Sequence, residues 1–279
     1  MDAFHQKLLA FFAEGDEHMV LGPIRRVREN PVSVTARLAS SKLGRTVHAE
    51  SLLEYDFLNI LDFDPRVEKY GEQCLAIPWR DGNGRPRKYH PDVLVKFYRN
   101  VLERIDGYGG DPNVRFRSTI YEVKPSEVLR ADWRELKPKY QGALRALRGT
   151  GVRFRLITEK QIRPVFAHNV RLLLGYKVDQ ANRTAHSSED AMDEELGQLL
   201  RVLKEPITPQ EILDRFGQSF ELRARLLARL WRMLAKCMFD ADLTEPLTMS
   251  TPIWPGQLYT YPGQFPTPRW RLPQHDWYR

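Results

Sequence analysis

The chain has 279 residues, enough for two domains of about 150 residues each, and 42% of its residues are aliphatic or aromatic, which suffices for buried cores. Lysine and arginine number 43 against 36 aspartates and glutamates, and this net charge of +7 favours a polyanionic partner. Two cysteines exclude a disulfide framework and a cysteine-based zinc site, and no apolar run approaches the roughly 18 residues of a membrane span, so we expect a reduced, cytoplasmic protein without a membrane partner.

Residues 1–20 are predicted to contain a short amphipathic helix. Its apolar residues recur at helical spacing: Phe4, Leu8, Phe11 and Phe12. The helix either packs into the core or offers a docking face to a partner. Acidic residues follow its apolar part closely, which argues against a signal peptide.

Residues 21–48 are basic and rich in serine and threonine. Two interpretations remain open for this segment. It is a solvated arm, or it is an arm that contacts the phosphates of a nucleic acid and so positions the protein on it. In the second case the contacting residues are Arg25, Arg26, Arg28, Lys42 and Arg45.

The next segment, residues 48–61, has the apolar spacing of a helix. On a helical wheel Glu54 lies inside the stripe formed by Phe57, Leu58 and Leu61. A carboxylate that faces a core is costly unless it is paired or binds a metal, so Glu54 is a candidate metal ligand. Glu50 also lies near the stripe, but at the start of the helix, where an acid is favoured without any metal.

Two predicted strands carry the central motifs, Tyr-His-Pro-Asp at 89–92 and Glu-Val-Lys at 122–124. Because side chains alternate along a strand, Glu122 and Lys124 share one face, and Asp92 can meet them at one edge of a sheet. A carboxylate pair can chelate one or two Mg2+ ions, and Mn2+ can take their place. A lysine beside the metal can orient a water molecule or neutralise the negative charge that develops on a phosphorane. This is the pattern of the PD-(D/E)XK nucleases. The alternative is two amphipathic strands joined by a surface salt bridge.

The remaining elements of this half are strands at 67–73, 74–79 and 152–158 and a long basic helix that begins near Ser126 and is interrupted before Pro138. Gln73 is either an amide that supports the site or part of an ordinary strand surface. The order of elements predicts an α/β fold, a mixed sheet flanked by helices.

Several motifs in this order and spacing resemble TnsA, the endonuclease subunit of heteromeric cut-and-paste transposases. They are Glu50 to Glu54, Leu61 to Pro65, Val67, Gln73, Tyr89 to Asp92, and Glu122 to Pro125. The resemblance covers about residues 20–170 and implies a restriction-endonuclease-like fold. Residue by residue, it assigns catalysis to Glu54, Asp92, Glu122 and Lys124, and metal binding to the three acids. Some family members have glutamine where this chain has Glu122, so the metal site here resembles that of ordinary restriction enzymes in charge.

The resemblance also implies a function and partners. The protein would cut the 5′ ends of a transposon, the non-transferred strands of double-stranded DNA. A TnsB-like DDE transposase would cut and join the 3′ ends, and a TnsC-like AAA+ ATPase would link the complex to target selection.

From residue 165 the composition becomes helical and leucine-rich, with a polar linker at 177–190. Thr208 to Glu211 open a helix that Gly217 ends, a second helix runs from Ser219 to about Lys236, and residues 239–249 can form a wing. We therefore expect a nuclease domain at 1–176, with the amino-terminal helix and basic arm, and a winged-helix-type domain at 177–279. The alternative is a helical bundle with a solvated basic face.

The second helix carries a basic stripe, Arg225, Arg229 and Arg232, which contacts either DNA or a protein partner. Residues 251–279 hold many prolines and aromatic residues and are expected to lie along a surface of this domain or of a partner.

Three functions remain open: a metal-dependent endonuclease for transposon 5′ ends, a stand-alone PD-(D/E)XK restriction or repair nuclease, and a catalytically silent DNA-binding assembly factor. The complete set of three acids and a lysine argues against the third. Neighbouring genes for a DDE transposase and an AAA+ ATPase would separate the first from the second.

Overall fold

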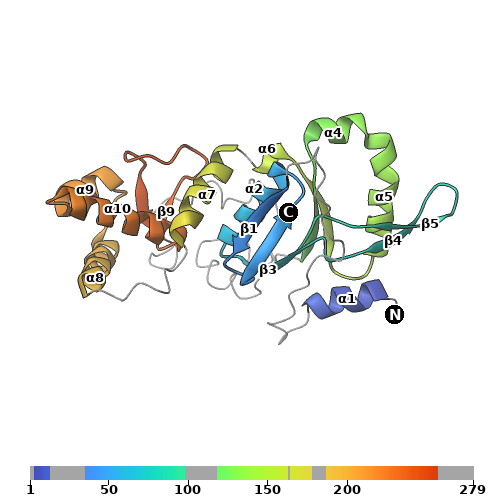
Figure 1. Cartoon of the computed structure of the whole chain (residues 1–279), viewed down its shortest axis with the longest axis horizontal. Helices are drawn as coiled ribbons and strands as arrows, with labels where there is room; N and C mark the ends of the chain where they lie inside the picture. Colours follow the sequence, from blue (N-terminus) through green and yellow to red (C-terminus); the bar gives the residue numbers. More distant parts are fainter. Residues whose placement is uncertain (1–2, 13–34, 98–117, 163, 178–186, 257–279) are drawn as a thin grey trace. The chain divides into compact units, whose positions relative to one another are not determined.

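A computed structural model describes residues 3–12, 35–97, 118–162, 164–177 and 187–256 (Figure 1). The described residues fall into two compact units, the first ending at Ile162 and the second holding 164–177 and 187–256. The division lies before helix α7 (Pro164–Lys177) rather than at residue 176, because α7 packs against α10 (Phe220–Ala235) of the second unit.

The first unit is built on a four-stranded mixed sheet. Its strands are β3 (Val67–Glu72), β6 (Val93–Phe97), β7 (Thr119–Val123) and β8 (Arg153–Ile157), in the order β3-β6-β7-β8. The first two pairings are antiparallel and the pairing of β7 with β8 is parallel. This is the predicted α/β arrangement, and it is consistent with a restriction-endonuclease-like fold.

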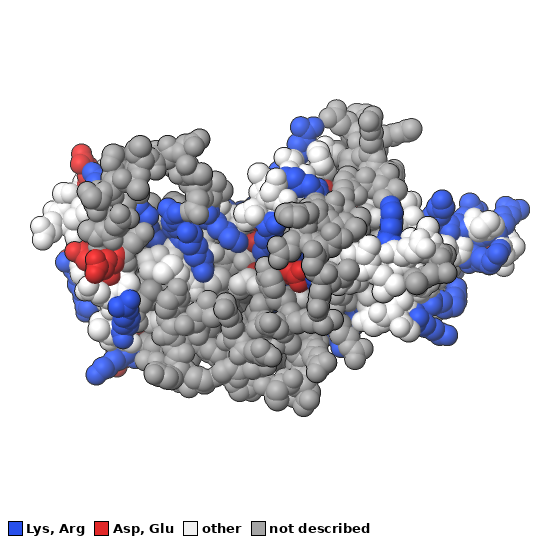
Figure 2. All heavy atoms as spheres, turned by 90° about the horizontal axis from the view of Figure 1, so that it is seen from below, with Lys and Arg blue, Asp and Glu red and all other residues white. Residues whose placement is uncertain are grey.

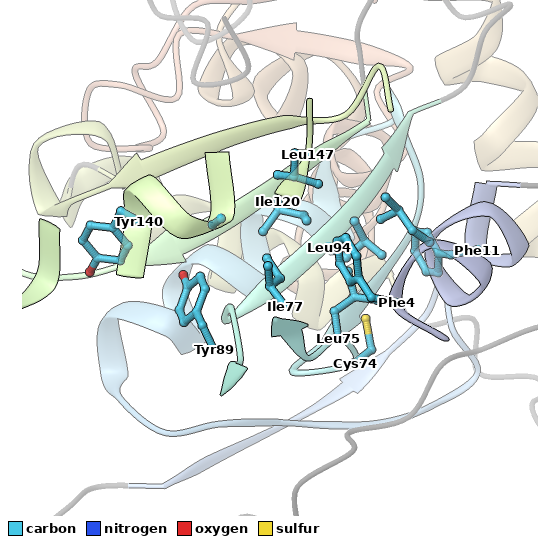
Figure 3. Packing of buried hydrophobic residues seen from close by; sticks show 12 residues of the cluster. Phe4, Phe11, Cys74, Leu75, Ile77, Tyr89, Leu94, Ile120, Tyr140 and Leu147 are labelled. Carbon is cyan, nitrogen blue, oxygen red and sulfur yellow. The ribbon is translucent and has the colours of Figure 1, made fainter. Parts of the chain in front are cut away.

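Helices cover both faces of this sheet. On one face, α1 (Ala3–Phe12) and α5 (Trp133–Ala146) pack with Leu94 and Ile120 of the strands in a single apolar cluster (Figure 3). On the other face, Phe57 of α2 (Leu52–Phe63) meets Tyr121 of β7, with 5.1 Å between ring centroids. The amino-terminal helix is therefore a core element, because its apolar stripe is buried.

Part of the predicted basic arm is a β-hairpin, β1 (Ala36–Ser40) paired with β2 (Arg45–Ala49). Its turn is tied to α2 by Asp62, whose carboxylate accepts hydrogen bonds from the Ser40 hydroxyl at 2.5 Å and the Ser41 hydroxyl at 2.8 Å. The backbone N–H groups of Ser41 and Lys42 donate to the same carboxylate. Burial acts to raise the pKa of Asp62, but these hydrogen bonds prevail and lower it.

Replacing Asp62 by alanine should therefore destabilise the first unit. These four donors, and the Tyr70 hydroxyl at 3.3 Å, would lose their acceptor. We expect the free energy of unfolding at neutral pH to fall by about 2 to 3 kcal/mol, measured by urea denaturation. Because the folded-state pKa of Asp62 is depressed, the stability that its carboxylate contributes is fully present above the unfolded pKa. This stability is lost as the pH falls through the folded-state pKa. Asp62→Asn, which keeps one acceptor oxygen, should cost less. Equal stability of Asp62→Ala and the wild type would show that the hairpin is held by other contacts.

A second hairpin, β4 (Ile77–Arg80) paired with β5 (Pro86–Tyr89), connects β3 to β6. The basic helix is divided as expected, because α4 (Ser126–Ala131) ends at Asp132 before α5 begins, although Pro138 itself lies inside α5. The short helix α6 (Glu159–Ile162) closes the first unit.

The second unit contains α7, α8 (Ser187–Val202), α9 (Pro209–Phe216), α10, β9 (Phe239–Ala241) and β10 (Ile253–Pro255). Thr208 caps α9 in a capping box with Glu211, and Gly217 ends the helix. Ile207 forms a bridge to Ile253, and β10 pairs with β9, so a wing follows two consecutive helices, as in a winged-helix domain. The wing reaches Pro255, because the first residues of the predicted tail supply its second strand. Residues 257–279 lie outside the described part.

The predicted linker is shorter than expected, because α7 continues to Lys177 and α8 starts at Ser187. Within the described ranges, no helix has both the length and the apolar character needed to traverse a bilayer.

Candidate active site

Strand register brings the two central motifs together. Val93 pairs with Tyr121 in antiparallel orientation, so Asp92, just before Val93, lies beside Glu122, just after Tyr121. Asp92 is 9% exposed, and its Oδ2 accepts the Val123 backbone N–H at 2.7 Å. Lys124 follows the strand, with its Nζ 3.9 Å from Glu122 Oε1. The structure brings these three side chains together, as predicted, at one end of the two inner strands β6 and β7 rather than at an edge strand.

Glu122 is held by residues that the sequence analysis did not single out. The Tyr89 hydroxyl donates to Oε2 at 2.5 Å, and the Tyr140 hydroxyl and Lys139 Nζ each lie 3.2 Å from Oε1. Burial, and after it the charge of Glu122, raises the pKa of both tyrosines, so both hydroxyls keep their protons and act as donors. Tyr89 stands next to the Asp92 motif and could have been noticed, but the contribution of α5 has no local signal in the sequence.

The surrounding carboxylates favour the charged form of Lys124. Desolvation, the largest single influence, opposes the charged ammonium, but the carboxylates of Asp92 and Glu122, followed by Glu54, together raise the pKa of Lys124. A lysine in this state does not take a proton from water at neutral pH. It can donate hydrogen bonds and stabilise negative charge.

Glu54 lies at the start of α2, only 8% exposed. Ser51 is the N-cap and accepts the Glu54 N–H, while the Glu54 carboxylate accepts the Ser51 hydroxyl at 3.1 Å and the Glu50 N–H at 2.9 Å. Desolvation raises the pKa of Glu54. The pattern Ser-x-x-Glu could have indicated this capping role, which the wheel alone did not reveal. Glu54 also acts electrostatically on both Asp92 and Lys124, so it belongs to the same charged group.

Comparison with known families gives a match to one segment of the first unit. Residues 64–159 match the family model described as TnsA-like endonuclease N terminal. Residues 64–159 are a TnsA-like endonuclease domain. The matched segment contains Asp92, Glu122 and Lys124, and Glu54 precedes it. No curated protein matches the chain. The resemblance noted in the sequence is thereby confirmed, and the TnsA-like domain supports a nuclease that associates with DNA and a transposase system.

The charges of the TnsA-like site suit a hard divalent cation. Burial is the main reason why the pKa of Asp92 is raised well above its ordinary value, and the negative charges of Glu122 and Glu54 raise it further. Three acids against the two lysines, Lys124 and Lys139, leave a net negative charge that a divalent ion would offset. Among the described residues, no three acids, histidines or cysteines already stand around a common ion position. Mg2+ needs only one or two carboxylates, because it retains several waters.

Two polar groups beside Asp92 lack a hydrogen-bond partner within the described ranges: Gln73 Oε1 and His90 Nδ1. Gln73 is buried, has a positive φ of 44°, and donates its backbone N–H to the Asp92 carbonyl at 2.8 Å. The hypothesis of an ordinary strand surface is therefore wrong for Gln73. Left-handed backbone in a residue other than glycine is costly and tends to occur at functional sites.

Lys42 and Arg45, two of the predicted binding residues, make contacts within the first unit. Lys42 Nζ donates to the backbone carbonyls of Asp64 and Val67, just after the end of α2, where a cation is favoured. Arg45 makes two hydrogen bonds to the Glu72 carboxylate, at 2.5 and 2.6 Å, which raise its pKa. Both cations are thus engaged within the first unit, because the segment folds back as the β1–β2 hairpin.

The other predicted binding residues lie elsewhere. Arg25, Arg26 and Arg28 fall outside the described residues. Arg225 is exposed on α10, 3.9 Å from Glu221 one turn earlier, and Arg229 and Arg232 are half-buried on the same helix. These three belong to the second unit and are not part of the TnsA-like domain.

The role of Glu54 can be separated from capping by charge-neutral substitution. Glu54→Gln keeps an acceptor oxygen for the Ser51 hydroxyl or the Glu50 N–H, so its melting temperature should stay within a few degrees of wild type. If Glu54 is a metal ligand, strand scission should fall about a hundredfold or more. Glu50→Gln, the matched control one turn earlier, should retain most activity. The opposite ranking in a nicking assay would assign the helix acid to Glu50.

Proposed function

We propose that this protein is a Mg2+-dependent DNA endonuclease that hydrolyses phosphodiester bonds at the 5′ ends of a transposon, the non-transferred strands. It would act with a TnsB-like DDE transposase and a TnsC-like AAA+ ATPase. The observation that carries this proposal is the placement of Asp92, Glu122 and Lys124 together at one end of strands β6 and β7, within the segment that matches a TnsA-like endonuclease domain.

The acids of the site would hold the ion. Asp92 is oriented by the Val123 N–H, and Glu122 by the Tyr89 and Tyr140 hydroxyls, so each carboxylate keeps a fixed direction without an ion. When bound, the divalent cation polarises the phosphoryl group and lowers the pKa of a coordinated water.

Lys124 would act on the phosphate. Its ammonium is charged and half exposed, so it can donate to the attacking water or to a non-bridging phosphate oxygen. In the transition state the phosphoryl oxygens carry additional negative charge, and a fixed cation stabilises that state more than the substrate. Because Lys124 keeps its proton, we assign it electrostatic stabilisation and not general-base catalysis.

The second unit would dock the nuclease into the transposition complex. It has the element order of a winged helix and presents Arg225 on the exposed side of α10.

The deciding experiment is reconstitution with the candidate transposase and ATPase on DNA labelled on each strand at a transposon end. We expect nicking of the 5′-end strand that requires Mg2+, stops with a chelator and resumes with Mn2+. Cleavage of unrelated DNA without the partners would favour the stand-alone nuclease. No scission with any divalent ion, from a folded protein, would overturn the endonuclease proposal.

A further inference from the structure

The β4–β5 hairpin runs directly into the candidate active site. Its second strand ends at Tyr89, which binds Glu122, and Asp92 follows three residues later. The first strand is reached from Gln73, which hydrogen-bonds to Asp92. The end of the hairpin formed by Ile77 and Tyr89 therefore adjoins the metal-site acids, and its strands lead from there to the turn at 81–85.

One face of the hairpin is fixed to α5. Ile77 and Tyr89 are paired and buried, and Trp79 lies on the same face. A Cβ added to Gly142 of α5 would lie 2.6 Å from Trp79 Cβ, so the two backbones approach as closely as a glycine allows. The hairpin is thus a supported element and not an isolated ribbon.

The opposite face is exposed and basic. Register pairs Pro78 with Lys88 and Arg80 with Pro86, and all four residues are exposed. Four cations and one acid lie between residues 77 and 89, a net charge of 4 − 1 = +3. Figure 2 shows Lys and Arg side chains gathered at the right, where Figure 1 places the hairpin.

The turn of the hairpin is pre-organised. Asp81 Oδ1 accepts the N–H groups of Asn83 and Arg85 at 3.0 Å each, and Gly84 takes a positive φ of 75°. Arg87 pairs with the Asp81 carboxylate at 3.0 Å, so the only acid of the hairpin is already engaged. The Arg85 and Lys88 side chains have no hydrogen bond or ion pair to any described residue.

We propose that this exposed face, with Arg80 and Lys88, together with Arg85 of the adjoining turn, contacts the phosphates of duplex DNA that flank the bond to be cut. This inference rests on the proposed endonuclease function and names the surface of the nuclease unit that holds its substrate. A two-stranded ribbon fits a DNA groove, and unneutralised arginine and lysine side chains suit phosphate oxygens.

The same features disfavour a protein strand as the occupant. Pro78 and Pro86 have no backbone N–H to donate to an added strand, and charges on an edge discourage strand addition. Lys42 and Arg45 are engaged within the nuclease unit, so they do not provide this surface.

The test is salt-dependent binding of the full-length protein to a duplex of about 30 base pairs, measured by fluorescence anisotropy without divalent metal from about 50 to 200 mM salt. The variant is Arg80→Ala/Arg85→Ala/Lys88→Ala. The control, Lys160→Ala/Arg201→Ala/Lys204→Ala, removes three exposed positive charges from other elements. Each lost phosphate contact lowers the slope of log K against log salt by about 0.9, so the hairpin variant should lose about 2 to 3 units of slope and at least about tenfold in affinity. The control should keep the wild-type slope.

A second measurement locates the contact directly. Cys74 and Cys237 are buried, and burial raises the pKa of Cys74 to about 12, so a cysteine introduced by Arg85→Cys would be labelled selectively by an environment-sensitive fluorophore. DNA should change the emission of this label and leave that of a label at Lys204→Cys unchanged.

The outcomes separate the two proposals, because binding is measured without the metal that cleavage requires. Equal salt slopes for the hairpin variant and the control would overturn the hairpin inference and leave the endonuclease proposal intact. Binding of an acidic protein to this face in place of DNA would have the same consequence. Absence of salt-dependent duplex binding by the wild type would also overturn it. Loss of slope only in the hairpin variant would support the inference even if no nicking were found.

Discussion

Asp92→Asn should abolish metal-dependent strand scission, with a loss of at least about a thousandfold, while leaving the fold intact. Asparagine still offers an oxygen to the Val123 N–H, so the local hydrogen bond is retained. It removes a negative oxygen ligand from a site that has few. The measurement is the nicking rate on labelled DNA with saturating Mg2+, and a wild-type rate would overturn the assignment of Asp92.

The same substitution should raise stability in metal-free buffer, in a pH-dependent way. The folded-state pKa of Asp92 is raised, chiefly by burial and then by Glu122 and Glu54. The free energy of unfolding is therefore undiminished by Asp92 below the unfolded pKa, where the carboxyl is protonated in both states. It falls as the pH rises from the unfolded pKa toward the folded value. The melting temperature of Asp92→Asn should exceed that of the wild type at pH 7 and approach it near pH 3.5. Mg2+ should raise the wild-type melting temperature and not that of the variant.

Lys124→Met should lower the nicking rate by about a hundred- to a thousandfold. Methionine preserves the length of the side chain and removes the charge that would stabilise the phosphoryl oxygens. Mg2+ affinity, measured by calorimetry, should be unchanged or higher, because a cation beside the ion opposes its binding.

Lys124→Arg is the matched control for charge. It keeps a cation but changes the geometry of its donors, so intermediate activity is expected. Full activity of Lys124→Met would reduce Lys124 to an ion-pair partner of Glu122. A rate that falls together with Mg2+ affinity would assign it to the metal site itself.

The local pattern of the sequence was sufficient to predict the two strands that carry the candidate active site. Alternating apolar residues predict β6 and β7, and the motifs at their ends place Asp92, Glu122 and Lys124 near one another. The capped start of α9 and the buried stripe of α10 were predicted for the same reason. Periodicity and capping depend on residues within one or two turns of the chain, which the sequence displays directly.

Other features depend on residues that are distant in sequence. Lys42 and Arg45 resemble phosphate-binding cations by composition, but the fold brings Val67 to the first and Glu72 to the second, 25 and 27 residues away. Tyr89 reaches Glu122 across 33 residues and Tyr140 across 18, and α7 joins the second unit through its packing on α10. The sequence by itself determined which residues alternate, cap and carry charge. Which charges remain available to a substrate was decided only by the tertiary structure, because a side chain's partner is set by sheet register and helix packing and not by its neighbours in the chain.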